Sequence, residues 1–299
     1  MWFKQLSIYP LNKETLPALA VITDKLAKAA FTPCLGLDWD SSGFAPSAPF
    51  GSEMVFAAQN TWRIALKKEE KVLPSAVIRD VLDDRIANIQ AAEARSLGRK
   101  EKQELKEQIT DDLLPRAFTK SSRIEAIIDT DNGLLLINQA NANKAETLLT
   151  QLRDALGGLD ARLPDTKQSP GSVMTHWLFH GAAAGGFELD SDCELKGLGD
   201  SAATVRMSKQ DLLAEEVVNH IKSGKTVTQL GLCWQERVRF VLTDTWTLKR
   251  IQFLDVLQEE AANHGDDPES LLFASQILMT ETLSGLIAEL AVHLGGWSE

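Results

Sequence analysis

The sequence has few cysteines and no long run of apolar residues. Among its 299 residues are three cysteines, Cys34, Cys193 and Cys233, which are far apart and odd in number. This argues against a disulfide framework and predicts free thiols in a reducing compartment. No stretch reaches the ~18–20 apolar residues that cross a bilayer, and the N-terminal MWFKQLSIYPL lacks a basic leader and a cleavage site. We therefore expect a cytoplasmic protein.

Basic residues are absent from the C-terminal end of the sequence. The chain carries 31 Lys and Arg against 42 Asp and Glu, a formal net charge of −11. No Lys or Arg follows Arg250, whereas nine acids do, which leaves 31 bases and 33 acids in residues 1–250. Because charges are screened over ~8–10 Å, this nearly neutral body can still carry a basic face. The composition therefore permits a nucleic-acid partner, from which the acidic end would point away.

Apolar periodicity predicts helices mixed with antiparallel strands. Without a regular βαβ alternation, the pattern favours an α+β fold with antiparallel sheets and packed helices. The predicted strands are 2–8, 54–58, 62–66, 123–129, 134–138, 226–234 and 238–243, with short strands after a linker at 164–171. The predicted helices are 16–30, 75–114 with a break at Gly98, 143–156 closed by Gly157, one that begins at Ser208, 254–263 and 268–294, and residues 33–51 are predicted to be a loop.

These elements group into three parts. Residues 1–74 and 121–163 are expected to form a central α+β domain, and residues 164–299 a C-terminal α+β domain. Residues 75–120 are a charged helical insertion between two β regions. We expect this insertion to project as a helical tip subdomain.

Two motifs of known chemistry are incomplete. Residues 223–226, Ser-Gly-Lys-Thr, resemble the end of a phosphate-binding loop, but Asn219 stands where its first glycine should be, and the order is helix before strand. His176 and His180 are spaced like zinc ligands, but no glutamate follows His176, and the aromatic residues between them suggest a strand. We therefore expect no metal and no cofactor.

Asp129 and Asp131 are the candidates for a metal-dependent nuclease. They flank the predicted Asn132-Gly133 hairpin turn, where aspartate is favoured for local hydrogen bonds. No nucleophile elbow and no redox cysteine pair accompanies them. We therefore expect no catalytic residue.

Two basic segments are the candidate DNA-contacting parts of the insertion. Residues 95–106 have five bases against two acids, and residues 116–123 have three bases against none. A helical run joins them, so both could lie at one tip; the alternative is a solvated helical face with ion pairs between turns. Phe118 lies in the second segment, where its residue type favours burial over exposure as a contact. The candidate cations are Arg95, Arg99, Lys100, Arg116, Lys120 and Arg123.

Lys209 and Gln210 follow Ser208 in the first turn of a predicted helix. A cation there opposes the helix dipole, unless it joins the helix N–H groups in binding a phosphate. The residues alone leave this open against a surface lysine without function.

Long blocks of the sequence resemble the RdgC family in collinear order over nearly the whole chain. The blocks are MWFKQLSIY (1–9), AFTPC (30–34), KKEEKVLPSAVI (67–78), LLPRAF (113–118), IDTDNGLLLI (128–137), SKQDL (208–212) and ILMTETLSGLIAELAVHLGG (277–296). The resemblance implies a bacterial, nucleoid-associated protein that binds single- and double-stranded DNA without marked sequence preference. It also implies a ring-shaped homodimer that antagonises RecA, with no catalytic activity and no cofactor.

The resemblance also assigns roles to particular residues. By position in the matching blocks, Lys209 and Gln210 fall at the start of the family's DNA-contacting helix, and Phe118 falls on the apolar residue that closes the ring against the dimer partner. Arg95 falls within the basic tip helices. Residues 95–100 are less basic than is usual in the family, which predicts a weaker contribution from the tip.

Two alternatives to DNA encirclement remain open on the sequence. The first is an acidic protein-interaction regulator that contacts RecA directly, because no base follows Arg250. The second is a nuclease that uses Asp129 and Asp131.

Overall fold

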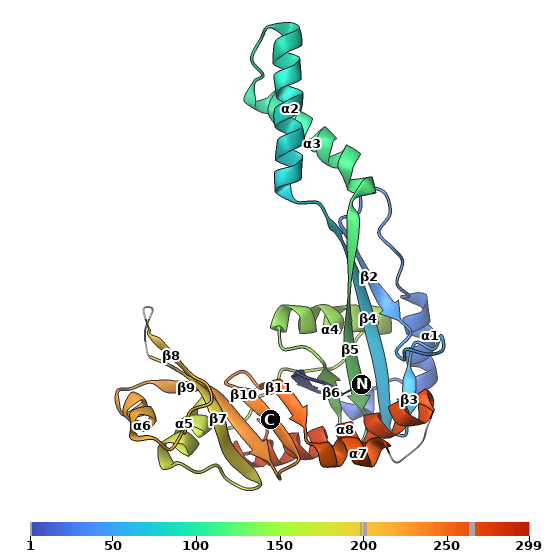
Figure 1. Cartoon of the computed structure of the whole chain (residues 1–299). Coiled ribbons are helices and arrows are strands. Elements are labelled where there is room, and N and C mark those ends of the chain that lie inside the picture. The colour runs from blue at the N-terminus through green and yellow to red at the C-terminus, as the bar shows by residue number, and fades with distance from the viewer. Residues whose placement is uncertain (1, 198, 200–201, 263–266, 299) are drawn as a thin grey trace. The chain divides into compact units, whose positions relative to one another are not determined.

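The computed structural model describes residues 2–197, 199, 202–262 and 267–298, which fall into two compact units (Figure 1). The first unit comprises Met1–Leu26, Pro46–Ala65 and Ile124–Glu299, and the second comprises Ala27–Ala45 and Leu66–Arg123. Among the sequence predictions, Asn263 of the last-but-one helix and the acids Asp266 and Glu299 lie outside the described residues.

Antiparallel strands form the first unit. Their order is β4-β5-β6-β1-β11-β10-β9-β7-β8, with β3 beside β4, and the recorded registers are antiparallel. The strands are β1 (Leu6–Pro10), β3 (Phe56–Ala58), β4 (Thr61–Val72), β5 (Phe118–Asp129), β6 (Leu134–Ile137), β7 (Phe187–Lys196), β8 (Thr204–Met207), β9 (Thr226–Trp234), β10 (Val238–Thr243) and β11 (Thr247–Phe253). The predicted α+β class with antiparallel pairing is confirmed.

Helices cover both faces of this sheet. The main core contains α5 and α8 side chains packed against inward residues of β1, β6 and β7 to β11, while α4 lies on the other side of β6 (Figure 1). The helices are α1 (Leu19–Lys28), which extends into the second unit, α4 (Ala142–Leu156), α5 (Pro170–His180), α6 (Glu215–Lys222), α7 (Asp255–Ala262) and α8 (Pro268–His293), with a short 3-10 turn at Lys13–Thr15.

Helix α8 is long and apolar enough to cross a membrane, contrary to the expectation that no segment would be. More than half of its most apolar segment is buried within the protein, however, and Leu283, Leu286 and Leu290 are fully enclosed in the core. Burial in the interior accounts for its composition, because a helix that is apolar on most sides is typical of a large core as well as of a membrane span.

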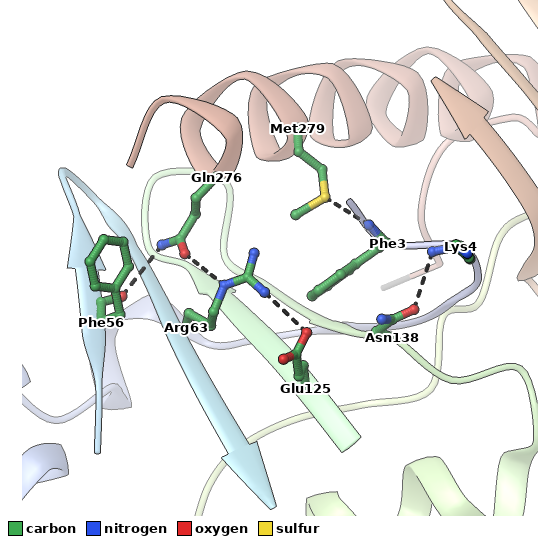
Figure 2. Close-up of polar contacts among 8 residues, drawn as sticks. All are labelled: Phe3, Lys4, Phe56, Arg63, Glu125, Asn138, Gln276 and Met279. Atoms are coloured by element: carbon green, nitrogen blue, oxygen red, sulfur yellow. Dashed lines mark hydrogen bonds and ion pairs between the residues drawn. The ribbon is translucent and has the colours of Figure 1, made fainter. Parts of the chain in front are cut away.

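A buried arginine joins α8 to the sheet. The Arg63 side chain on β4 is 1% exposed. Its Nε donates to Gln276 Oε1 of α8 at 3.0 Å, and its Nη1 lies 3.1 Å from Glu125 Oε2 of β5 (Figure 2). Gln276 Nε2 in turn donates to the Thr61 carbonyl at 2.9 Å. Because a buried charge is stable only when it is paired and hydrogen-bonded, this contact fixes the position of α8 on the β3–β4 hairpin.

The second unit contains β2, a pair of helices, and the parts of β4 from Leu66 onward and of β5 up to Arg123, because both strands continue from the first unit. The strand order is β2-β4-β5, with β2 at Asp40–Ala45 inside the segment that was predicted to be a loop. The helices are α2 (Ser75–Glu93) and α3 (Arg99–Leu113), followed by a 3-10 turn at Leu114–Arg116. Gly98 is the N-cap of α3, so the predicted break is confirmed. Ile78 and Ile109 are the only buried residues that these two helices contribute among the described residues.

The segment around His176 was predicted to be a strand and is helix α5. Ser169 caps this helix by accepting a hydrogen bond from the Ser172 amide, Pro170 occupies its first turn, and Gly181 ends it at φ +70°. These are strong helix boundary signals, and they outweigh the aromatic residues inside. His176 and His180 therefore lie one turn apart, with ring centroids separated by 4.3 Å.

Candidate nucleic-acid interface

Lys209 and Gln210 lie in a loop and not at a helix start. The predicted helix begins at Glu215, and its N-cap is Ala214. The backbone of Lys209 has φ +56°, and its amide donates to Asp192 Oδ1 at 3.3 Å. The backbone amide of Gln210 donates to the Ser191 carbonyl at 3.0 Å. These contacts tie the loop to β7, so helix N–H groups cannot contribute to a phosphate site at Lys209.

The loop nevertheless presents one exposed cation. Lys209 is exposed, and its ammonium has no hydrogen bond or ion pair in the described part of the chain. Gln210 is half-buried, and its Nε2 donates to Glu216 Oε1 at 2.6 Å. Of the two predicted residues, therefore, Lys209 is available to a phosphate, while the Gln210 amide already has a partner.

Three further cations line a shallow cleft that begins beside this loop. The cleft has a volume of about 420 Å³. Its lining includes Arg206 of β8, Ser208, and Lys249 and Arg250 of β11. Together with Lys209 they place four cations in one region of the first unit, and three of them are not among the residues predicted from the sequence.

A β-bulge brings the two adjacent cations of β11 to the cleft. The register of β10 and β11 shifts between Arg239 and Val241, and Arg250 has φ +51°. In a regular strand, neighbouring side chains point to opposite faces, so only one of Lys249 and Arg250 would line the cleft. The adjacent bases Lys249 and Arg250 are the one feature of the sequence that could have indicated this cleft. Only the bulge, which the sequence does not reveal, lets both of them line it.

Carboxylates hold two of these arginines in place. Arg250 Nη1 lies 3.0 Å from Asp192 Oδ2, and Arg206 pairs with Glu194. Burial opposes ionisation of Glu194, but hydrogen bonds from Arg206 and Thr228 outweigh burial and hold its pKa below the ordinary value. Both arginines are largely exposed, so they can reach an anion in solvent while their neighbouring acids fix their positions. Lys209 and Lys249 carry the excess positive charge.

The cysteine in the cleft is not a reactive group. Cys193 is buried, and burial raises the pKa of its thiol to about 11. A thiol with a raised pKa remains protonated near neutral pH and is a poor nucleophile.

Two cations of the first predicted basic segment, Arg95 and Lys100, are paired with neighbouring acids. Arg95 forms ion pairs with Glu93 and Glu101, and these hydrogen bonds raise its pKa above the ordinary value. Lys100 lies 3.8 Å from Glu104 one turn away. These contacts agree with the alternative interpretation of the sequence, in which the segment is a solvent-exposed helical face with ion pairs between its turns. Arg99 is exposed in the first turn of α3.

The second basic segment is open to solvent. Arg116, Phe118 and Lys120 are all exposed, and Phe118 has 86% of its surface accessible. The expected burial of Phe118 is therefore wrong. Phe118 and Lys120 lie on the same face of β5, because side chains alternate along a strand. Arg123 is also exposed but has partners within the chain.

Helix α3 contains the later part of the first basic segment, residues 99–106, and ends before the second segment begins. It spans Arg99–Leu113, which corresponds to roughly 22 Å at 1.5 Å per residue. The suggestion that both segments share one tip is therefore wrong, because Arg95 and Arg116 belong to opposite ends of this helix.

The aspartates at the β5–β6 turn hold the turn together. Asp129 is 3% exposed and accepts hydrogen bonds from the amides of Asp131 and Asn132 and from Ser284. Asp131 Oδ2 accepts from Asn60 Nδ2 at 2.9 Å. In the described residues, no three His, Cys, Asp or Glu side chains are grouped so as to hold a metal ion. The local hydrogen bonds that favour aspartate in a turn account for both residues.

Within its described residues, the chain is thus an α+β protein in which three cations line a shallow cleft on an antiparallel sheet. Comparison with known proteins identifies it more closely. The family described as "Putative exonuclease, RdgC" matches residues 1–297. The chain belongs to the RdgC family of recombination-associated proteins.

Several relatives cover the whole chain. It is 64% identical over 299 residues to recombination-associated protein RdgC of Neisseria meningitidis serogroup B, with all of both chains covered. It is 52% identical over 300 residues to the protein of that name from Laribacter hongkongensis, again over both full lengths. The protein of that name from Pseudomonas aeruginosa is 37% identical over 301 residues, covering 99% of this chain and 98% of the relative.

Proposed function

We propose that the protein binds single- and double-stranded DNA without sequence preference, as a ring-shaped homodimer, and that it antagonises RecA in homologous recombination. The observation that carries this proposal is the gathering of Arg206, Lys209, Lys249 and Arg250 around one open cleft. Cations on a sheet surface suit the phosphate backbone, which supplies most of the affinity in sequence-independent binding. Membership of a recombination-associated family supports DNA as the partner.

A closed ring of two protomers requires two separate contacts between them. The exposed Phe118, beside Arg116 and Lys120, is the apolar surface that we assign to this contact. In this proposal, residues 75–120 project as a helical tip, residues 1–74 with 121–163 and residues 164–299 form the body, and the protein acts on the nucleoid in the cytoplasm. Occupation of DNA by a closed ring would obstruct the RecA filament without any catalytic step.

Lys209→Ala is expected to weaken binding to all duplex sequences about equally. Each lost phosphate contact should reduce the slope of log affinity against log salt by ~0.9, and a two-fold dimer loses the contact twice, about 1.8 in total. Fluorescence anisotropy with several labelled duplexes over a salt series measures this. Lys144→Ala, which removes an exposed lysine of α4, is the control and should leave the slope unchanged. Loss confined to particular sequences would contradict backbone binding.

Phe118→Ser is expected to weaken the dimer. An exposed aromatic side chain at the centre of an interface commonly contributes ~2 kcal/mol or more, so the dissociation constant should rise about thirtyfold by sedimentation equilibrium. Leu163→Ser, at a side chain 74% exposed in the first unit, is the matched control. If both variants sediment like the unaltered protein, Phe118 does not close the ring.

A nuclease is the competing activity, and the name of the family motivates its test. We expect no cleavage of linear or circular DNA in the presence of Mg²⁺, because the Asp129 carboxylate already accepts hydrogen bonds from its turn and from Ser284. Asp131→Asn keeps an oxygen that can accept from Asn60 and should therefore fold and leave DNA binding unchanged. Cleavage by the unaltered protein that disappears in Asp131→Asn would overturn the non-enzymatic proposal.

A further inference from the structure

A groove beside the first turns of α8 combines an apolar floor with an acidic end. Its volume is about 590 Å³, within the ~300–1,000 Å³ of typical binding sites. All of it belongs to the first unit. The lining residues are Gln59 from the β3–β4 turn, Asp267, Glu269 and Ser270 at the start of α8, and Phe273, Ala274, Ile277 and Leu278 further along the same helix.

The apolar part of the groove rests on packed structure. Ile277 packs against the small core cluster that contains Phe56 and Leu272, and Gln276, on the same turn, is hydrogen-bonded to β4. Phe273 remains 39% exposed above this floor. A partly exposed aromatic side chain on a rigid support is the usual form of an anchor in protein interfaces, because little entropy is lost when a partner covers it.

The negative charge of the groove favours a cationic partner over an anionic one. Among the described residues, two acids and no base line the groove, and Glu269 has no ion pair in this part of the chain. The amides of Glu269 and Ser270 donate to Asp267 Oδ1 at 3.0 Å, so a carboxylate of the chain already occupies the positive end of the helix. An anionic ligand would meet these carboxylates, whereas a cationic one would complement them.

We propose that this groove docks a basic, amphipathic peptide segment of another protein. Apolar side chains of the segment would cover Phe273 and Ile277, and its Lys or Arg residues would lie beside Glu269, in the helix-in-groove mode of recognition. The site uses none of the DNA-contacting residues proposed above. It gives the protein a second partner whose binding does not depend on DNA.

The test uses a defined probe on the full chain. The probe is a fluorescein-labelled helical peptide of about 15 residues, roughly four turns, with leucines on one face and lysines elsewhere, measured by anisotropy at ~0.15 M salt. We expect saturable binding that Phe273→Asp weakens at least about tenfold and Glu269→Lys weakens several-fold. Val292→Asp, at a side chain 70% exposed on α8 outside the groove, and Glu188→Lys on β7 are the controls and should bind like the unaltered chain.

Several results would overturn the docking proposal. They are absence of saturable binding, equal weakening by the control variants, equal binding of a peptide with glutamates in place of the lysines, and displacement of the peptide by duplex DNA. Dissociation of the dimer by Phe273→Asp in sedimentation would assign the groove to a second copy of this chain instead. Circular dichroism checks folding, and Phe273→Ser replaces Phe273→Asp if the latter unfolds.

Discussion

Replacement of Arg63 by leucine is expected to lower the free energy of unfolding by about 3–5 kcal/mol, the range for breaking a buried ion pair. The guanidinium lies in the interior, 3.1 Å from Glu125 and 3.0 Å from Gln276, and 5.3 Å from the ring centroid of Phe3. Leucine removes the donor, so the Glu125 carboxylate, which is 16% exposed, loses its ion pair with Arg63, and the fully buried amide oxygen of Gln276 loses its hydrogen bond from Arg63. Urea unfolding followed by circular dichroism measures the change.

Two variants separate burial from simple loss of charge. Arg162→Leu removes an arginine that is 74% exposed and paired with Asp160 at 3.3 Å, and an exposed pair contributes at most about 1 kcal/mol. The double variant Arg63→Leu/Glu125→Leu removes both charges of the buried pair and should recover part of the loss, because apolar replacement of a whole buried pair is often nearly neutral. Equal destabilisation by Arg63→Leu and Arg162→Leu would show that Arg63 does not fix α8 on the sheet.

The elements whose boundaries are set by nearby residues could be predicted from the sequence. Gly133 at φ +64° and Gly157 at φ +75° are the positions at which a hairpin and a helix C-terminus need left-handed backbone, and glycine marks both in the sequence. The helices at 75–93 and 99–113 and the paired strands β9 and β10 were predictable for the same reason. In each case, the residues that define the structure lie within a few positions of one another.

The predicted start of α6 at Ser208 was wrong, because contacts with a distant strand outweighed the local capping pattern. Ser208 with Asp211 three residues later suggests a capping box, but Asp211 accepts from the Leu213 amide within a turn. The amide of Lys209 is meanwhile drawn to Asp192 of β7. The helix therefore begins only at Glu215. A capping pattern spans only four residues, so it cannot include the competing contact with Asp192, which lies 17 residues earlier in the chain.

The cleft and the buried arginine also depend on distant residues. Arg206 lies on β8 and Arg250 on β11, and helix α6 and strands β9 and β10 separate these two strands in the chain. The bulge that turns Arg250 toward the cleft is set by pairing with β10. Arg63 looks like any surface arginine in its hairpin, since its partner Gln276 lies 213 residues later in the chain. Alternation identifies a face of a strand, but it cannot say which face a distant helix will cover.

The cleft predicts the largest effect on DNA binding. Replacing Arg206, Lys209, Lys249 and Arg250 together by alanine should reduce duplex affinity at least about a hundredfold at low salt. Eight phosphate contacts in a two-fold dimer would account for a salt slope of roughly 7, at ~0.9 for each contact. The variant should lose most of that slope, because the cations that displace counterions are gone. Anisotropy with a labelled duplex over a salt series measures both quantities.

The decisive control is a variant with the same loss of charge elsewhere on the first unit. Lys13, Lys144, Arg162 and Lys167 are exposed and do not line the cleft, so their joint replacement by alanine makes the chain equally more acidic. If only the total charge governed association, both variants would weaken binding alike, since long-range repulsion depends on the net charge of the protein. If the cleft holds the backbone, only the cleft variant should lose its salt slope, because counterion release requires cations placed against phosphates. Equal losses would therefore remove the cleft from the proposal even though DNA binding itself remained.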